Sequence, residues 1–210
     1  MPRSARSNPL ALAVLACLYE RPMHPYEVAQ TLRSRAKHES IRLNYGSLYG
    51  VVELLEKRGF IRARETVREG RRPERTVYEI TEEGARELDD WLSELIATPV
   101  KEYLQFEAAL SLLPVLPPHV AVSVLAERAT ALELKLVQMR SALQLAASSG
   151  LPRLFELEAE YVESLTVAEL EFVRRLVKDI ESGELEGLEM WRGWFTGDGD
   201  MAWHPEPPAG

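Results

Sequence analysis

The chain has 210 residues, a formal net charge of −8 and 46% hydrophobic residues, which is enough for a substantial core. Its single cysteine, Cys17, excludes an internal disulfide. The apolar run from Leu10 to Leu18 is far shorter than the roughly 20 residues of a membrane helix. We therefore expect a cytoplasmic protein of one large or two small domains, without a secretory signal or membrane contact.

The charges are distributed unevenly along the sequence. Residues 1–80 contain 15 Lys+Arg and 9 Asp+Glu, a net charge of +6, whereas residues 81–210 contain 10 and 24, a net charge of −14. The local field decides whether a region attracts nucleic acid, not the net charge of the whole chain. The asymmetry indicates two functional halves, of which the first suits a polyanionic partner.

Two helices are predicted in the first 35 residues. The first begins after Asn8, a suitable N-cap, and ends near Arg21. It is apolar almost all round, which is typical of a helix enclosed between two layers. The second begins at His24 and Pro25 and ends at about Arg35.

A third helix is predicted between Asn44, as N-cap, and Gly59, which suits the position after a helix end. Four apolar residues at helical spacing predict its buried face: Leu48, Val51, Val52 and Leu55. The opposite face and its flanks hold small and hydroxyl residues: Tyr45, Gly46, Ser47, Tyr49 and Gly50. Each glycine costs about 1 kcal/mol of helix propensity relative to alanine. That cost favours a surface that another backbone, such as a DNA strand, approaches closely.

Two strands are predicted next, at residues 60–65 and 76–80, joined by a polar loop. Four arginines lie in or next to this loop: Arg68, Arg71, Arg72 and Arg75. An isolated loop of this kind is more often a solvated turn with local ion pairs. Directly after a recognition-type helix, it is better suited to phosphate contact or to the minor groove. Three helices and a two-stranded wing predict a mainly α fold of the winged helix-turn-helix type (α+β winged helix).

The remaining sequence is predicted to be helical up to residue 182. A fourth helix runs from Thr81 to about residue 97, with Ala85, Leu88, Leu92 and Leu95 on one face. Further helices are predicted at 101–113, 117–148 and 152–182. We expect a DNA-binding domain at 1–98, a helical dimerisation domain at 99–182 and a mobile tail at 183–210 containing Gly, Pro and Trp. Residues 191–195 could dock on the helical body; a ligand or partner role is the alternative.

Helices of ~30 residues are ~45 Å long, which is more than a small domain covers by itself. We therefore predict that a second copy of the chain covers part of their apolar stripe, and an antiparallel hairpin within one chain is the alternative. The predicted dimer interface consists of Leu132, Leu136, Met139, Leu154, Tyr161, Leu165, Phe172 and Leu176.

Three motifs occur in order in the first 95 residues or so: LALAVLACLYERPMHPYEVAQTL at 10–32, GSLYGVVELLEKRGFI at 46–61, and, after the arginine-rich turn, VYEITEEGARELDDWL at 77–92. With these motifs the sequence resembles the PadR family of bacterial transcriptional regulators, and the segment at 10–32 resembles the first two helices of that family. The long helices resemble only the general architecture of its larger members.

The resemblance implies a repressor that binds a palindromic operator as a homodimer, and in some members is released by a small molecule. By position, the segment Ser47, Leu48 and Tyr49 matches the recognition-helix motif of the family. The wing is matched by Arg71, Arg72 and Arg75. Where the family commonly has a proline or similar residue after the Leu-Tyr pair, this chain has Gly50.

The predicted DNA-binding residues come from three segments of the first domain. Ser47 and Tyr49 would donate hydroxyl hydrogen bonds to phosphates or base edges, and the amides of the helix N-terminus favour anions. The full set is His24, Tyr26, Asn44, Tyr45, Gly46, Ser47, Tyr49, Gly50, Lys57, Arg68, Arg71, Arg72 and Arg75.

The sequence offers little for other functions. Its four histidines are scattered without metal-ligand spacing, and motifs for zinc, phosphate or nucleophilic catalysis are missing, so we predict no enzyme, metal or cofactor. The rival function is a winged helix that contacts proteins and does not bind DNA. Trp91 and Phe106 are predicted to line a pocket for a small aromatic effector, although such aromatics more often belong to a core.

Overall fold

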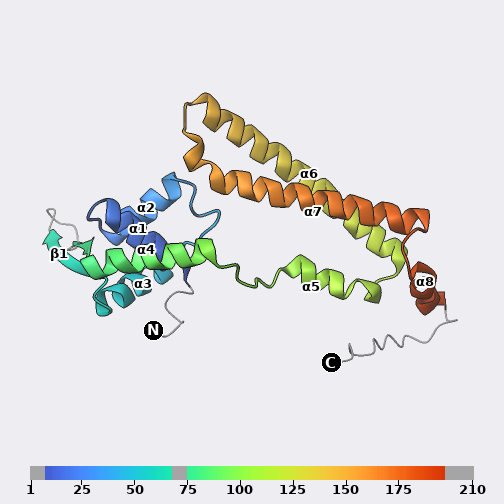
Figure 1. The fold of residues 1–210 in the computed structure, drawn as a ribbon, viewed down its shortest axis with the longest axis horizontal. Helices are drawn as coiled ribbons and strands as arrows, with labels where there is room; N and C mark the ends of the chain where they lie inside the picture. Colours follow the sequence, from blue (N-terminus) through green and yellow to red (C-terminus); the bar gives the residue numbers. More distant parts are fainter. Residues whose placement is uncertain (1–7, 68–74, 197–210) are drawn as a thin grey trace. The chain divides into compact units, whose positions relative to one another are not determined.

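The structure, a computed structural model, describes residues 8–67 and 75–196. The chain divides into two compact units, Met1–Lys101 and Glu102–Gly210, each with its own core (Figure 1). The described residues are mostly helical with one two-stranded sheet, as the sequence predicts. None of the described helices is long and apolar enough to cross a membrane.

The first unit is a winged helix. Its elements are α1 (Pro9–Glu20), α2 (Pro25–Ser34), α3 (Tyr45–Lys57), β1 (Ile61–Val67), β2 (Arg75–Ile80) and α4 (Glu82–Ala97). The N-caps follow the sequence signals: the Asn8 side chain accepts from the Leu10 amide at 3.0 Å, and Asn44 accepts from the Ser47 amide at 2.7 Å. Gly59 ends α3 with a φ of +76°, a conformation that suits glycine.

The two strands pair antiparallel, with Ile61 opposite Ile80 and a bulge between Ala63 and Glu65. The sheet is tied to the start of α2 because Met23 and Tyr78 exchange two backbone hydrogen bonds of 3.0 Å each. The loop between the strands, residues 68–74, lies outside the described residues, and so do three of the predicted wing arginines.

The core of the first unit surrounds α1, which packs against α2, α3, α4 and β2. Val14 and Leu15 are fully buried, so the all-round apolarity of this helix is explained within its own unit. Cys17 lies in the same core, where burial raises the pKa of its thiol.

The junction of β1 and α4 is unusually close. A Cβ atom added to Gly84 would lie 2.0 Å from the carbonyl oxygen of Phe60, so only glycine fits there. Thr81 caps α4 by accepting from the Gly84 amide at 3.0 Å, and its hydroxyl lies 2.7 Å from the carbonyl oxygen of Gly59.

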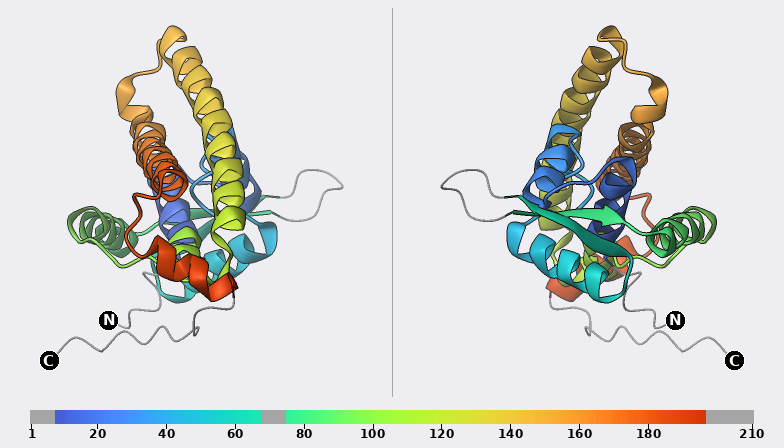
Figure 2. Two further views of the ribbon diagram at one scale, coloured as in Figure 1. Left: turned by 90° about the vertical axis from the view of Figure 1, so that its right-hand side faces the viewer. Right: turned by 90° about the vertical axis from the view of Figure 1, so that its left-hand side faces the viewer.

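The second unit is built on a long helical hairpin. Its elements are α5 (Gln105–Ser111), the 3₁₀ turn η2 (Leu113–Val115), α6 (Pro118–Ser148), the 3₁₀ turn η3 (Arg153–Phe155), α7 (Leu157–Ser182) and α8 (Leu188–Thr196). Helices α6 and α7 lie side by side in all views (Figures 1 and 2). Three ion pairs connect them across the hairpin: Arg128–Glu169, Arg140–Glu163 and Arg174–Glu133.

The hairpin corrects part of the predicted dimer interface. Leu132 and Leu136 are only 8% and 5% exposed because they pack in the core that α6 and α7 form within one chain. They therefore have no free surface for a second copy. Leu154 lies in η3 and not in a regular helix, because the helix predicted at 152–182 begins only at residue 157. The helix predicted at 101–113 begins at residue 105.

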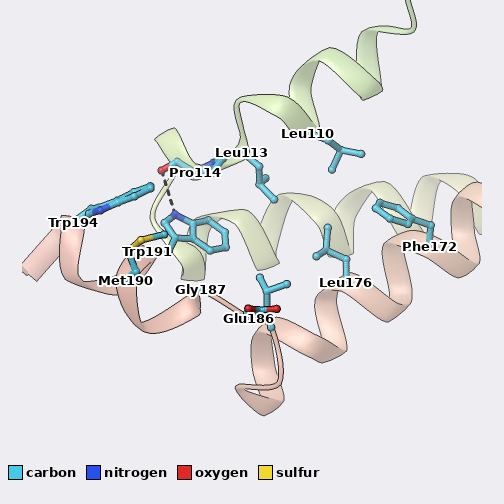
Figure 3. Close-up of a pocket in the computed structure, with 11 residues that line it drawn as sticks. Leu110, Leu113, Pro114, Phe172, Leu176, Glu186, Gly187, Met190, Trp191 and Trp194 are labelled. Carbon is cyan, nitrogen blue, oxygen red and sulfur yellow. Dashed lines mark hydrogen bonds between the residues drawn. The ribbon is translucent and has the colours of Figure 1, made fainter. Parts of the chain in front are cut away.

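The predicted mobile tail is wrong for residues 188–196. These residues form α8, which the indole of Trp191 anchors to the unit: Nε1 donates to the carbonyl oxygens of Leu116 at 2.9 Å and Pro114 at 3.2 Å. Glycines at 183 and 187 adopt positive φ angles and turn the chain from α7 into α8. The docking considered for residues 191–195 is found at Trp191 (Figure 3), whereas the glycine- and acid-rich composition gave no sign of the helix itself. Residues 197–210 lie outside the described residues.

Candidate nucleic-acid interface

The outward face of α3 is open and contains the residues that the sequence assigns to DNA. Tyr45 and Tyr49 are 40% and 45% exposed, and Ser47 beside them is exposed as well. A Cβ atom on Gly50 would meet nothing within 4 Å, and one on Gly46 would meet only Asn44 Oδ1 at 3.7 Å. Packing within the chain therefore does not require either glycine, and both leave α3 accessible to an external backbone.

An aromatic pair extends this face onto α2. The rings of Tyr26 and Tyr45 are stacked, with centroids 6.2 Å apart and planes 10° from parallel. Arg33, in the last turn of α2, donates to the Tyr45 hydroxyl at 2.5 Å and lies 4.7 Å from the centre of its ring. These contacts hold Tyr45 at the N-terminus of α3 and add a cation to the surface.

Sequence reasoning named the two tyrosines and missed Arg33. Its position near a helix end is explained by the helix dipole alone. Twelve residues and a loop separate it from Tyr45. Only the fold brings the two side chains together, so no local pattern could have paired them.

The polar residues at the starts of α2 and α3 act as caps. His24 Nδ1 accepts from the Tyr26 amide at 3.1 Å, and the Glu27 carboxylate accepts from the His24 amide at 2.8 Å. Asn44 caps α3 in a similar way. The caps fix the first turns of both helices, whose remaining amides can bind anions.

The wing strand β1 adds two arginines that the sequence analysis did not select. Arg62 and Arg64 are exposed, and both face the same carboxylate: Arg62 lies 2.7 Å and Arg64 3.8 Å from Glu79. One carboxylate between two guanidiniums leaves a net positive charge. At the other end of α3, Lys57 is exposed in the last turn. Arg75 opens β2, and its side chain is outside the described set.

Residues 14–90 match the sequence model of the Transcriptional regulator PadR-like family. These residues lie in the first unit, which is PadR-like. The PadR-like family is a family of transcription regulators and not of enzymes. No curated protein matches the chain significantly in sequence.

Solved structures of PadR-like proteins have the same fold. Bacillus subtilis PadR in complex with operator DNA is 20% identical, with 88% of this chain and 99% of that chain covered and a TM-score of 0.58. The same protein in complex with p-coumaric acid is 16% identical, with 86% and 98% covered and a TM-score of 0.65. The PadR-like transcriptional regulator BC1756 from Bacillus cereus is 17% identical, with 83% and 99% covered and a TM-score of 0.56.

The two aromatics assigned to an effector pocket each serve as core residues in this PadR-like chain. Trp91 is 3% exposed in the core of the first unit, where its Nε1 has no hydrogen-bond partner in the described part of the chain. Phe106 packs against the core of the second unit, with the Arg128 guanidinium 3.7 Å from the centre of its ring. Their positions favour core packing, which was the alternative to an effector pocket.

Metal binding finds no support within residues 8–67 and 75–196. In these ranges no group of three or more His, Cys, Asp or Glu side chains is arranged to hold a metal ion.

Proposed function

We propose that this PadR-like chain is a repressor that binds a palindromic operator as a homodimer and is released by a small aromatic effector. The observation that carries the proposal is the open face of α3. A Cβ atom on Gly50 would enter empty space and one on Gly46 would only touch Asn44 Oδ1 at 3.7 Å, and hydroxyl side chains flank both glycines. The face continues onto α2 through the pair of Tyr26 and Tyr45, which Arg33 holds in place.

Electrostatics supports DNA as the partner of this face. The first 80 residues have a net charge of +6, and the N-terminus of α3 offers backbone amides to a phosphate. Except for Asn44, which acts as the cap, the predicted contact residues of α3 include no Asn or Gln side chain that could pair with adenine. Affinity would then come mainly from phosphate contacts and DNA shape.

Exposed apolar side chains support the homodimer. Leu154, Tyr161 and Leu165 are 71%, 64% and 52% exposed along η3 and α7. A second copy that covered them would also place two copies of α3 on two half-sites. Met139, Phe172 and Leu176 stay in the proposed interface, whereas Leu132 and Leu136 are withdrawn from it because the hairpin buries them.

The structures of Bacillus subtilis PadR with operator DNA and with p-coumaric acid support regulated DNA binding by proteins of this fold. The complex with p-coumaric acid supports release by an aromatic effector. Recovery of bound genomic fragments would supply the operator and its half-site spacing.

The test is the salt dependence of duplex affinity for the wild type and for Arg71→Ala with Arg72→Ala. Each lost phosphate contact should reduce the slope of log K against log salt by roughly 1, so the double variant should lose up to about 2. The matched control removes two exposed arginines of the second unit, Arg153→Ala with Arg192→Ala, and should leave the slope unchanged.

An unchanged salt slope in the variant Arg71→Ala with Arg72→Ala would contradict the assignment of these arginines to a DNA-binding wing. A wild type that shows no salt-dependent shift of any duplex would support the rival function, a winged helix that contacts only proteins.

A further inference from the structure

Arg33, in the last turn of α2, is held by an aromatic side chain of the next helix. Its Nη1 donates to the Tyr45 hydroxyl at 2.5 Å, and its guanidinium lies 4.7 Å from the centre of the Tyr45 ring. The Tyr45 ring is in turn stacked with that of Tyr26. A guanidinium that is held by a hydrogen bond and by a ring has lost much of its side-chain freedom before any ligand arrives, so less is lost when it binds.

The charge of Arg33 is not neutralised within the described residues. Residues 20–45 contain five Lys+Arg and only three Asp+Glu. All three carboxylates are engaged with other groups: Glu20 with Arg35, Glu27 with the His24 amide, and Glu39 with His38. No ion pair of Arg33 is found in the part of the chain that the structure describes. A guanidinium has several N–H donors, and the Tyr45 hydroxyl takes one of them, so the others are available to an anion.

Arg33 is exposed at the edge of the surface assigned to DNA. Tyr45 is the first residue of α3, and the exposed Ser47 and Tyr49 follow it, so the guanidinium lies beside the first turn of the recognition helix. The planar fork of a guanidinium matches the oxygens of a phosphate. Phosphate contacts next to a recognition helix fix its position on the duplex without reading bases. The anion that suits Arg33 is therefore a phosphate of the DNA backbone.

We propose that Arg33 is a DNA-contact residue and that Tyr45 is the positioning residue that holds it. The guanidinium binds one backbone phosphate through its remaining N–H groups while it stays hydrogen-bonded to the Tyr45 hydroxyl. Tyr45 then acts through Arg33 and not by a contact of its own with DNA, in contrast to the role that the sequence predicts for it. This inference rests on the proposed function, because it requires that α3 binds a duplex.

The experiment measures the affinity of the full chain for a mixed-sequence duplex against salt concentration, because a phosphate contact does not depend on the base sequence. Arg33→Ala should reduce the slope of log K against log salt by roughly 1 and weaken binding by about tenfold near ~0.1 M salt. Alanine favours a helix, so the fold should be retained. Arg33→Lys keeps the charge and should keep the slope, but it loses the planar fork and should bind about threefold more weakly than the wild type. A wild-type slope in Arg33→Ala overturns the proposal.

A double-mutant cycle tests the role of Tyr45. Tyr45→Phe removes the hydroxyl that accepts from Arg33 and keeps the ring, so it should weaken binding by about fivefold without a change of the salt slope. In the Arg33→Ala background the same substitution should have no effect, because the hydroxyl then has no guanidinium to hold. An equal effect of Tyr45→Phe with and without Arg33 would show that the hydroxyl contacts DNA directly, which overturns the positioning role.

Arg86→Ala is the matched control. It removes an exposed arginine of the same unit, on α4, whose guanidinium donates to the carbonyl oxygen of Glu82 in its own helix. Both the slope and the affinity should equal those of the wild type. A wild type without salt-dependent duplex binding would contradict the repressor and the role of Arg33 together. If the wild type binds in a salt-dependent way and Arg33→Ala has the same slope, only the role of Arg33 is contradicted.

Discussion

The two units differ in how far each one covers its own apolar residues. In the first unit Val14, Leu15 and Leu48 are completely buried, and the core reaches every helix of the winged fold. The second unit has a buried centre, but Leu145 and Leu154 are each 71% exposed on its long hairpin. The first unit exposes aliphatic side chains mainly at the end of α4, at Leu92, Leu95 and Ile96, whereas the second presents them along its long hairpin, where a partner would cover them.

The largest effect is expected at the closest packing of the first unit. In Gly84→Ala the new methyl group would lie 2.0 Å from the Phe60 carbonyl oxygen and 2.9 Å from Ile80 Cγ1. The carbonyl oxygen belongs to the backbone and cannot rotate away, so the free energy of unfolding should fall by about 3 kcal/mol. Urea unfolding followed by circular dichroism measures this change.

Gly50→Ala is the matched control because its methyl group enters empty space on α3. That substitution should raise the free energy of unfolding by about 1 kcal/mol through helix propensity. Equal stability of Gly84→Ala and the wild type would show that α4 does not pack on β1 as closely as described.

The next effect concerns the exposed surface of the second unit. Leu165→Asp replaces a side chain that is 52% exposed, so the hairpin should keep its helicity. Charge in a dimer interface should convert the dimer to a monomer, which sedimentation velocity detects. Loss of the link between two half-sites should then weaken operator binding by about 100-fold.

Leu112→Asp serves as the control, since Leu112 is 65% exposed but lies outside the α6–α7 hairpin. It should leave both the mass and the operator affinity unchanged. A Leu165→Asp protein that is still dimeric would move the interface away from this part of α7.

Local signals were sufficient for the winged helix. The caps at Asn8, Asn44 and Thr81 depend on atoms two or three residues away, so the sequence contains all that decides them. Periodicity also located the buried face of α3. On α4 it was less accurate: Leu88 is buried as predicted, but the fold buries Gly84 and Trp91, each one position before the predicted Ala85 and Leu92, and leaves Leu92 and Leu95 exposed.

Contacts between distant residues were not predictable in the same way. The carbonyl groups that hold Trp191 lie 75 and 77 residues earlier in the chain. The sequence therefore indicated that residues 191–195 could dock on the helical body but not where, and the acidic segment was assigned to a tail. The stripe through Leu132 and Leu136 was recognised, but a stripe does not specify whether the same chain or a second copy covers it. The contact between Arg33 and Tyr45 also spans a loop, so no local pattern predicted it.

The smallest effect is expected on the exposed face of the first unit. Tyr49 is 45% exposed, and no hydrogen bond of its hydroxyl is found within the described residues. If DNA covers this face, Tyr49→Phe removes one hydrogen bond and should weaken operator binding by about 1 kcal/mol, roughly fivefold, without changing the free energy of unfolding. A fluorescence anisotropy titration resolves this difference. Tyr103→Phe, in the second unit, should bind the operator like the wild type. Unchanged affinity in Tyr49→Phe would remove this hydroxyl from the interface and leave the arginines and the α3 amides as its main DNA contacts.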